Sequence, residues 1–218
     1  MINKTVEDYL KIIYWLSRLP GKVNTSAIAH ALKISSASVT DMLKRLSENG
    51  YITYTPYYGV RLAKKGEKTA LKVIRRHRLL ELFLVKALGY TWDSVHDEAE
   101  RLEHVVSDEL ESRIDTYLGN PRYDPHGDPI PTLEGVMEEL EYCKLSELQV
   151  GDQAIVSQVV DSKLLMQYMQ KMGLELQSRV LIKEKEFFDA SMKIKINGKK
   201  EHFLSHEASQ QIFVKKIK

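Results

Sequence analysis

The chain has 218 residues, a formal net charge of +2 and 43% hydrophobic residues, which is typical of a globular protein with room for two or three small domains. Because the charge is nearly balanced, any affinity for nucleic acid has to come from local basic patches. The single cysteine, Cys143, excludes an internal disulfide, and the segment Met1–Lys4 lacks the apolar core of a signal peptide. The most apolar run, 79–88, is too short and too interrupted by charge to cross a membrane.

The first predicted element is an amphipathic helix over 5–19. Its apolar residues recur at helical spacing, and Pro20-Gly21 ends it. Asp8 lies in the expected first turn, where a carboxylate suits the helix dipole. That local role is the ordinary explanation for this residue.

Residues 24–50 predict a helix-turn-helix. Thr25-Ser26 can cap a helix over 27–32, and Ser36 can cap a second helix over 37–48. The exposed start of the second helix carries small hydroxyl residues suited to a close approach to DNA, with a lysine for phosphates: Ser35, Ser36, Ser38, Thr40 and Lys44. A helical hairpin packed inside a core is the alternative.

A β-hairpin is expected directly after this pair of helices. Residues 51–54 and 60–62 favour strands, and the turn between them contains Pro56 and Gly59. A helix-turn-helix followed by a hairpin is a winged helix, whose wing would present Tyr57, Tyr58 and Arg61 to the DNA backbone. The lysines that follow begin a long helix to about Leu88, and they could equally form a solvated face.

Imidazoles and carboxylates gather in residues 75–104. On a helix His77 and Glu81 point the same way, and so do His96, Glu100, Glu103 and His104. Such a set beside an apolar stripe suits a borderline divalent metal. A solvated face with salt bridges is the alternative, and the spacing by itself does not decide between them.

From residue 119 onward the sequence pattern is no longer mainly helical. Residues 119–131 contain four prolines and predict a connecting loop, in which His126 is expected to be a loop residue rather than a ligand. Beyond about residue 145, short strands around a helix at 163–172, with a hairpin turn at Asn197-Gly198, indicate a small β-barrel. His202 and His206 are expected on its surface.

With this order of predicted elements, the chain resembles the metal-dependent repressors of the diphtheria-toxin-repressor family (DtxR, IdeR, MntR and relatives). The resemblance covers nearly the whole chain and is most specific in residues 76–81, 95–109 and 128–131. The resemblance implies a mainly α protein with a small β domain. The implied domains are a winged helix-turn-helix DNA-binding domain (1–72), a helical metal-binding and dimerisation domain with a Pro-rich loop (73–142) and an SH3-like FeoA-type β-barrel (143–218). It also implies a cytoplasmic bacterial regulator that binds palindromic operator DNA as a homodimer.

The family's metal ligands can be carried over position by position. The primary site would be formed by Asp8, Glu100, Glu103 and His104. The ancillary site would be formed by His77, Glu81 and His96, completed by Asp161 from the barrel. Two positions depart from the family pattern. Leu164 replaces a glutamine of the iron-type members, and Lys11 replaces a glutamate of the short manganese members, which argues against the binuclear arrangement of those short proteins.

Ligand chemistry indicates which metal to expect. Iron-type members have sulfur ligands where this chain has Asp8 and Glu100, and hard carboxylate oxygens suit manganese better than sulfur does. We therefore expect Mn²⁺ first and Fe²⁺ second, with about two ions per subunit and no role for a membrane or a small organic substrate. The expected function is repression of metal-uptake genes, with an iron-dependent repressor as the alternative.

The sequence leaves two other classes of function to consider, an enzyme and a sensor of a non-metal ligand. The metallohydrolase motif His-Glu-x-x-His is absent, and so is the Glu-x-x-His pair of di-iron bundles, so we do not expect an enzyme. A winged helix that senses a non-metal ligand is the remaining alternative.

Overall fold

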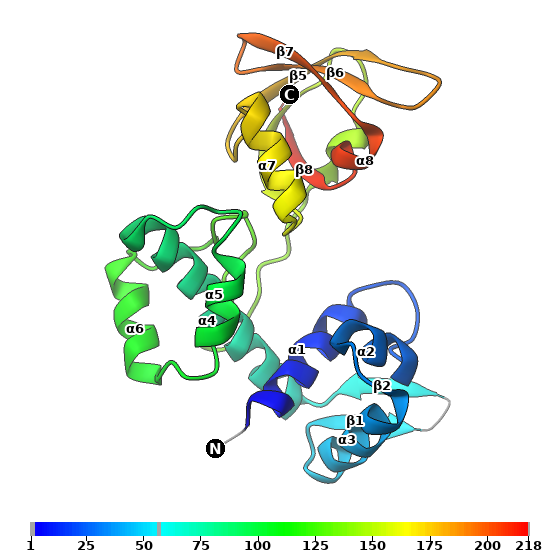
Figure 1. The fold of residues 1–218 in the computed structure, drawn as a ribbon, viewed down its shortest axis with the longest axis vertical. Coiled ribbons are helices and arrows are strands. Elements are labelled where there is room, and N and C mark those ends of the chain that lie inside the picture. Colours follow the sequence, from blue (N-terminus) through cyan, green and yellow to red (C-terminus); the bar gives the residue numbers. More distant parts are fainter. Residues whose placement is uncertain (1–2, 56–57, 218) are drawn as a thin grey trace.

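The computed structural model describes residues 3–55 and 58–217. Three groups of elements follow one another along the chain, coloured blue to cyan, green, and yellow to red in Figure 1. The first group consists of α1 (Lys4–Ser17), α2 (Thr25–Leu32), α3 (Ser36–Glu48), β1 (Ile52–Thr55) and β2 (Gly59–Leu62). The two strands pair antiparallel, so the predicted winged helix is present. The expected wing residue Tyr57 lies outside the described residues.

The helices of this group begin one or two residues earlier than the sequence predicts. Asn24, not Thr25 or Ser26, caps α2 by accepting a hydrogen bond from the Ala27 N–H, and Ser35, not Ser36, caps α3. Asn3 caps α1 in the same way, so α1 starts at Lys4 and Asp8 lies beyond its first turn. The side chain of an Asn or Ser cap accepts a hydrogen bond from the backbone N–H three residues further along. Because Asn3, Asn24 and Ser35 act as these caps, each helix starts at the residue directly after its cap.

The long helix α4 (Lys64–Leu88) belongs to two hydrophobic cores. Its first half contributes Ala70, Leu71 and Ile74 to the core of the winged helix. Its second half contributes Leu79, Leu80 and Leu82 to a core shared with α5 (His96–Leu102) and α6 (Asp108–Tyr117). In Figure 1 this helix runs from the winged helix into the middle group, so it connects the two as one continuous rod.

Buried ion pairs fasten α6 against α4. Arg75 contacts Glu111 and Asp115, and Arg76 contacts the other oxygen of Glu111 and Asp108. Both arginines are almost fully buried, which a charged side chain tolerates only when it is paired. These pairs make the middle group a rigid support for the second half of α4.

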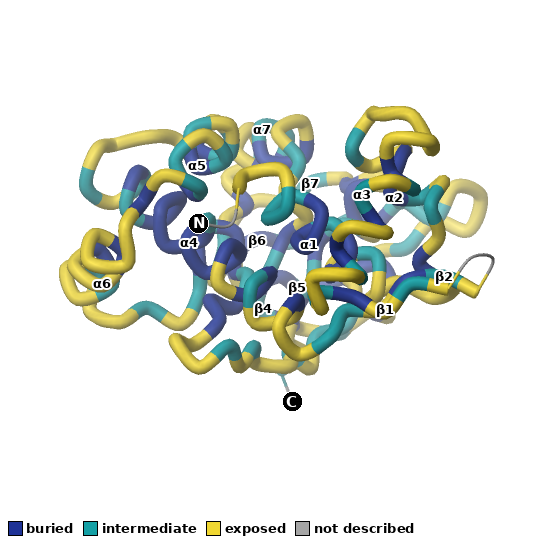
Figure 2. The backbone as a smooth tube through the Cα atoms, turned by 90° about the horizontal axis from the view of Figure 1, so that it is seen from below, coloured by how far each residue is buried: buried dark blue, intermediate teal, exposed yellow. Residues whose placement is uncertain are grey.

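The last group is an antiparallel sheet of six strands in the order β3-β8-β4-β5-β6-β7. The elements are β3 (Cys143–Lys144), a short 3-10 turn (Leu145–Glu147), β4 (Gln153–Val159), α7 (Lys163–Met172), β5 (Arg179–Lys185), β6 (Met192–Ile196), β7 (Lys200–Leu204), α8 (His206–Ser209) and β8 (Ile212–Ile217). Its alternating apolar residues form a separate core. Figure 2 shows that buried and exposed stretches alternate along the chain, with the buried ones toward the middle of the view. This is the small β domain that the strand pattern predicted.

The Pro-rich loop packs against this β domain. Gly127 lies so close to β4 that a Cβ atom there would stand 2.0 Å from the Ser157 carbonyl oxygen. The Val159 N–H donates to the His126 carbonyl at 3.0 Å, and the Gln158 amide donates to Asp128 at 2.9 Å. Within the described residues, no helix is both long and apolar enough to cross a bilayer.

Candidate metal centre and nucleic-acid interface

Three of the four residues expected at the primary site meet between α1 and the end of α5. His104 Nε2 lies 3.0 Å from Asp8 Oδ1 and 3.1 Å from Glu103 Oε1. Ligand atoms of Asp8, Glu103 and His104 all fall within 4.8 Å of one another. We call this set the primary trio. It combines two carboxylates with one imidazole and joins the first helix of the winged helix to the middle group.

The geometry of His104 fits a metal ligand. Its Nδ1 forms a 2.6 Å hydrogen bond with Glu7 Oε2, while its buried Nε2 has no hydrogen-bond partner with acceptable geometry among the described residues. A carboxylate on the far nitrogen of an imidazole orients the ring and raises its basicity toward a metal. Glu7 was not singled out from the sequence, although its position next to Asp8 was the available signal. The residues present therefore fit a bound divalent ion.

Glu100, the fourth expected primary ligand, lies beside the trio rather than in it. Its Oε1 accepts a 2.7 Å hydrogen bond from the ammonium of Lys11, which also lies 2.5 Å from Glu103 Oε1. Donor atoms of Glu100, Glu103 and His77 form another group within 4.8 Å. Glu103, which is fully buried, consequently stands at the junction of two groups of potential ligands.

The residues expected at the ancillary site also come together. His77 Nε2 lies 3.0 Å from Glu81 Oε1 and 3.3 Å from His96 Nδ1. Asp161, which follows β4, reaches this cluster with its Oδ2 at 2.6 Å from His96 Nδ1. The cluster therefore joins α4, α5 and the β domain.

His126 lies in the Pro-rich loop, as predicted, but it is not an ordinary loop side chain. It is 1% exposed, with Nδ1 at 3.7 Å from Glu81 Oε2 and Nε2 donating to the Trp92 carbonyl at 2.9 Å. Together with Asp124 and Glu81 it forms a fully buried group of potential ligands. The sequence pattern does not predict this group, because helical or strand periodicity carries no signal inside an irregular loop.

Ion pairs within these clusters shift several pKa values. Burial alone would lower the pKa of His77, but hydrogen bonds to Glu103 and Glu81 outweigh it and raise the pKa to about 9. The bonds of His96 to Asp161 and Glu81 raise its pKa to about 10. Burial raises the pKa of Asp8 above its usual value. Without metal, protons on the imidazoles therefore compensate the buried carboxylates.

The residues expected to contact DNA lie on or just before α3 and on the hairpin. Ser35, Ser36, Ser38 and Lys44 are exposed on or before α3, and Thr40 is half-buried with its hydroxyl bonded to the Ser36 carbonyl. Tyr58 is exposed at the hairpin, with the ammonium of Lys22 5.9 Å from its ring centroid. This places polar side chains at the start of α3 and on the hairpin toward solvent, as a groove-reading helix with a wing requires.

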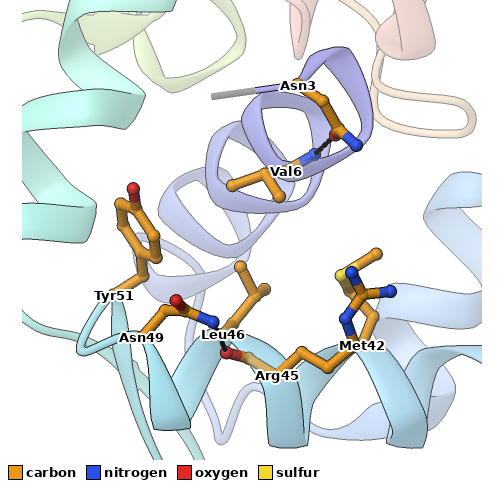
Figure 3. Close-up of a pocket in the computed structure, with 7 residues that line it drawn as sticks. All are labelled: Asn3, Val6, Met42, Arg45, Leu46, Asn49 and Tyr51. Atoms are coloured by element: carbon orange, nitrogen blue, oxygen red, sulfur yellow. Dashed lines mark hydrogen bonds between the residues drawn. The ribbon is translucent and has the colours of Figure 1, made fainter. Parts of the chain in front are cut away.

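A separate hollow of about 470 Å³ lies between α3 and the start of α1. Figure 3 shows Met42 and Arg45 of α3 on one side and Asn3 and Val6 on the other. None of the clustered imidazoles and carboxylates lines it. In the β domain, His202 and His206 are half-buried rather than on the open surface as expected, because each packs one ring nitrogen inside the domain.

Comparison with known proteins relates these sites to a family. Residues 1–60 match the model described as "Iron dependent repressor, N-terminal DNA binding domain", residues 63–132 match "Iron dependent repressor, metal binding and dimerisation domain", and residues 143–216 match "FeoA domain". The iron-dependent repressor IdeR of Mycobacterium bovis is 34% identical over 159 residues, which cover 70% of this chain and 69% of that protein.

Solved structures give the same assignment over the full length. A manganese-dependent transcriptional repressor in complex with manganese superposes with a TM-score of 0.90 at 36% identity, covering 97% of this chain and all of that one. The manganese regulator SloR superposes with a TM-score of 0.76 at 33% identity, with both chains covered completely. The chain therefore belongs to the diphtheria-toxin-repressor family of metal-dependent transcriptional repressors, in the form that carries a C-terminal FeoA domain.

Proposed function

We propose that this repressor is activated by Mn²⁺, with Fe²⁺ as the second candidate, and that it controls genes for metal uptake. The observation that carries the proposal is the primary trio. Its donors are carboxylate oxygens and one imidazole, with no sulfur, and such a set suits Mn²⁺ better than a softer metal. The similarity to manganese-dependent repressors supports the same choice, and the similarity to IdeR keeps iron as the alternative.

The primary trio would act by joining two parts of the chain. Asp8 comes from α1, which packs in the core of the winged helix, whereas Glu103 and His104 follow α5. Holding one ion between these ligands would fix the winged helix against the middle group of helices. Asp8, Glu103 and His104 would hold the ion, which would supply a positive centre shared by the three ligands. A higher affinity of this arrangement for the ion would shift the population toward it. A shift from 1:99 to 99:1 requires about a 10⁴-fold preference for that arrangement.

The ancillary cluster would act on the β domain. His77, Glu81 and His96 lie on α4 and α5, and Asp161 follows β4, so one ion held there would tie the FeoA domain to the middle group. We propose about two ions per subunit, one at each cluster. Glu81 belongs to this cluster through Oε1 and to the buried group of Asp124 and His126 through Oε2, so His126 is an additional candidate ligand.

We further propose that the chain acts as a homodimer on a palindromic operator, with α3 in the major groove and the hairpin on the backbone. In this scheme residues 1–72 bind DNA, residues 73–142 bind metal and dimerise, and residues 143–218 form the FeoA domain. The boundary near residue 72 falls inside α4, so the winged helix would be held by a continuous helix as well as by an ion at the primary trio.

Binding to DNA taken from upstream of metal-uptake genes, measured by fluorescence anisotropy, tests the function. Binding should disappear with a chelator, return with Mn²⁺ and be lost in Asp8→Ala. Binding that ignores the chelator would favour a regulator that senses a non-metal ligand. Stronger activation by Fe²⁺ than by Mn²⁺ at equal free concentrations would favour the iron-dependent alternative.

A further inference from the structure

Two adjacent phenylalanines of the β domain are fully exposed to solvent. Phe187 and Phe188 lie in the loop between β5 and β6 and are 103% and 100% exposed. Figure 1 shows this loop at the outer edge of the β domain, away from the two helical groups. Large apolar side chains are usually at least partly covered, so a fully exposed pair indicates a surface that contacts another molecule. We call residues 184–191 the Phe hairpin.

Hydrogen bonds fix the backbone of the Phe hairpin. The Glu186 N–H donates to the Ser191 carbonyl at 2.8 Å, and the Ser191 N–H donates to Asp189 Oδ1 at 2.9 Å. The loop therefore presents both rings on a prepared backbone, so that a partner restricts little additional conformational freedom when it binds them.

The charge of the Phe hairpin argues against an anionic partner. Its carboxylates are Glu184, Glu186 and Asp189, and its single cation, Lys185, directs its ammonium to two backbone carbonyls at 2.7 and 3.4 Å. Glu184 contacts Lys193, so Glu186 and Asp189 carry the charge nearest the rings. The phosphates of DNA or of a lipid surface would be repelled there. A fitting partner combines an apolar floor with a basic rim.

A hollow of about 590 Å³ on the same chain has this combination. It lies between the first half of α4 and the segment that joins α5 to α6, and its apolar lining consists of Val73, Val106 and the 75% exposed Val105. Glu7 and His104, which are hydrogen-bonded to each other, also line it, so the hollow adjoins the primary trio. We call it the α4 hollow. Four cations of α4 line it: Lys65, Lys68, Lys72 and Arg76.

Two of these four cations are available to a partner. Asp108 contacts both Lys72, at 2.7 Å, and Arg76, and so compensates part of their charge. Lys65 and Lys68 are exposed, and the Lys65 ammonium donates to a backbone carbonyl, which leaves its charge in place. Lys65 and Lys68 therefore supply the basic rim that the Phe hairpin requires.

We propose that the Phe hairpin of one copy of this chain docks in the α4 hollow of another copy. The two rings would pack on the valines, and the carboxylates of the hairpin would lie beside Lys65 and Lys68. Because the two surfaces differ, each copy offers one hairpin and one hollow, and successive copies can join in a row.

The size of the contact indicates where it acts. Two phenylalanines bury about 300–500 Å² of their own surface, well below the roughly 1,200 Å² of a stable interface. The contact is therefore weak in free solution and takes effect where DNA holds several copies side by side, at a high effective concentration. This effect on DNA rests on the proposed function, whereas the contact itself does not.

Sedimentation equilibrium of the full chain, over a concentration series that reaches the submillimolar range, measures the contact. The average mass of the parent should keep rising beyond that of a dimer, and Phe187→Ser combined with Phe188→Ser should remove that rise. Phe187→Leu combined with Phe188→Leu keeps apolar side chains and should retain most of it. Leu19→Ser, at an exposed leucine outside both surfaces, is the matched control and should behave as the parent. Circular dichroism confirms that each variant is folded.

Charge reversal tests whether the α4 hollow is the partner surface. Glu186→Lys and Lys68→Glu should each weaken the association, because like charges then face each other. An equal mixture of the two variants should recover it, since the reversed hairpin then meets the reversed hollow and the unchanged hairpin meets the unchanged hollow. Lys64→Glu changes an exposed lysine of the same helix that does not line the hollow, and it should leave the association unchanged.

Three results would overturn the inference. The first is a parent that never exceeds the mass of a dimer, or serine variants that associate as the parent does. The second is weakening in both charge variants without recovery in their mixture, because the hairpin would then contact another surface. The third is binding of the parent, but not of the serine variant, to phosphatidylglycerol vesicles, which would assign the hairpin to a lipid surface. Metal-dependent DNA binding is measured separately, so a failure of the proposed function is distinguishable from each of these results.

Discussion

Metal binding at the ancillary cluster should depend steeply on pH, because imidazoles have to lose their protons before they ligate a metal. The hydrogen bonds of His77 to Glu103 and Glu81 outweigh burial and raise its pKa to about 9. Those of His96 to Asp161 and Glu81 raise its pKa to about 10. At neutral pH both rings therefore carry a proton in the metal-free protein.

The expected magnitude follows from these two pKa values. At pH 7 a group with a pKa of about 9 is neutral in about 1% of molecules, and one with a pKa of about 10 in about 0.1%. Each required deprotonation changes the apparent affinity about tenfold per pH unit, so two of them predict a slope of about 2 in log K against pH. Raising the pH from about 6.5 to about 7.5 should strengthen binding about 100-fold, or roughly 2.7 kcal/mol.

Isothermal titration calorimetry with Mn²⁺ in buffers of different ionisation enthalpy counts the protons released. An Asp8→Ala background removes a ligand from the primary trio, so that the ancillary cluster dominates the signal. About two protons should be released per ion at pH 7, and the control His30→Gln, an exposed imidazole on α2, should leave the count unchanged. Release of less than one proton, with the same affinity at both pH values, would refute ligation by His77 and His96.

Four further changes test other parts of the structure. Ser38→Glu or Thr40→Glu should abolish operator binding in anisotropy assays and leave Mn²⁺ binding intact, because a carboxylate would face phosphates; normal binding would mean that α3 does not read DNA. Leu110→Glu, at an exposed apolar position on α6, should convert a dimer into a monomer in sedimentation at micromolar concentration, and an unchanged dimer would exclude this face. Gly127→Ala should lower the free energy of unfolding by at least about 1 kcal/mol, because the backbone is left-handed there and the Ser157 carbonyl leaves no space; an unchanged denaturation midpoint would contradict this packing. Without metal, the free energy of unfolding should fall as pH rises from about 6.5 to about 9, since the raised pKa of His77 stabilises the fold only while the ring is protonated; a rise over that range would show the opposite sign.

Local spacing in the sequence was sufficient for much of the fold. The pairing of His77 with Glu81, the two helices of residues 24–50 and the hairpin at Asn197-Gly198 are all present in the structure. Each depends on neighbours a few residues apart, and backbone hydrogen bonding within one element determines which side chains share a face. The predicted helix starts were wrong by one or two residues where neighbouring polar residues could each serve as the N-cap.

Contacts between distant elements could not be read from spacing. Lys11 meets Glu100 and Glu103 across about 90 positions of chain, and His126 meets Glu81 from an irregular loop. Family resemblance placed Asp161 near His96, but no periodicity in the sequence did so. The packing of α1 against α4, and of the Pro-rich loop against β4, determines these distances. The sequence alone therefore identified the kinds of ligand, whereas only the tertiary structure decided that Lys11 contacts Glu100 and Glu103, because an ammonium on α1 reaches carboxylates at α5 only when both helices pack against α4.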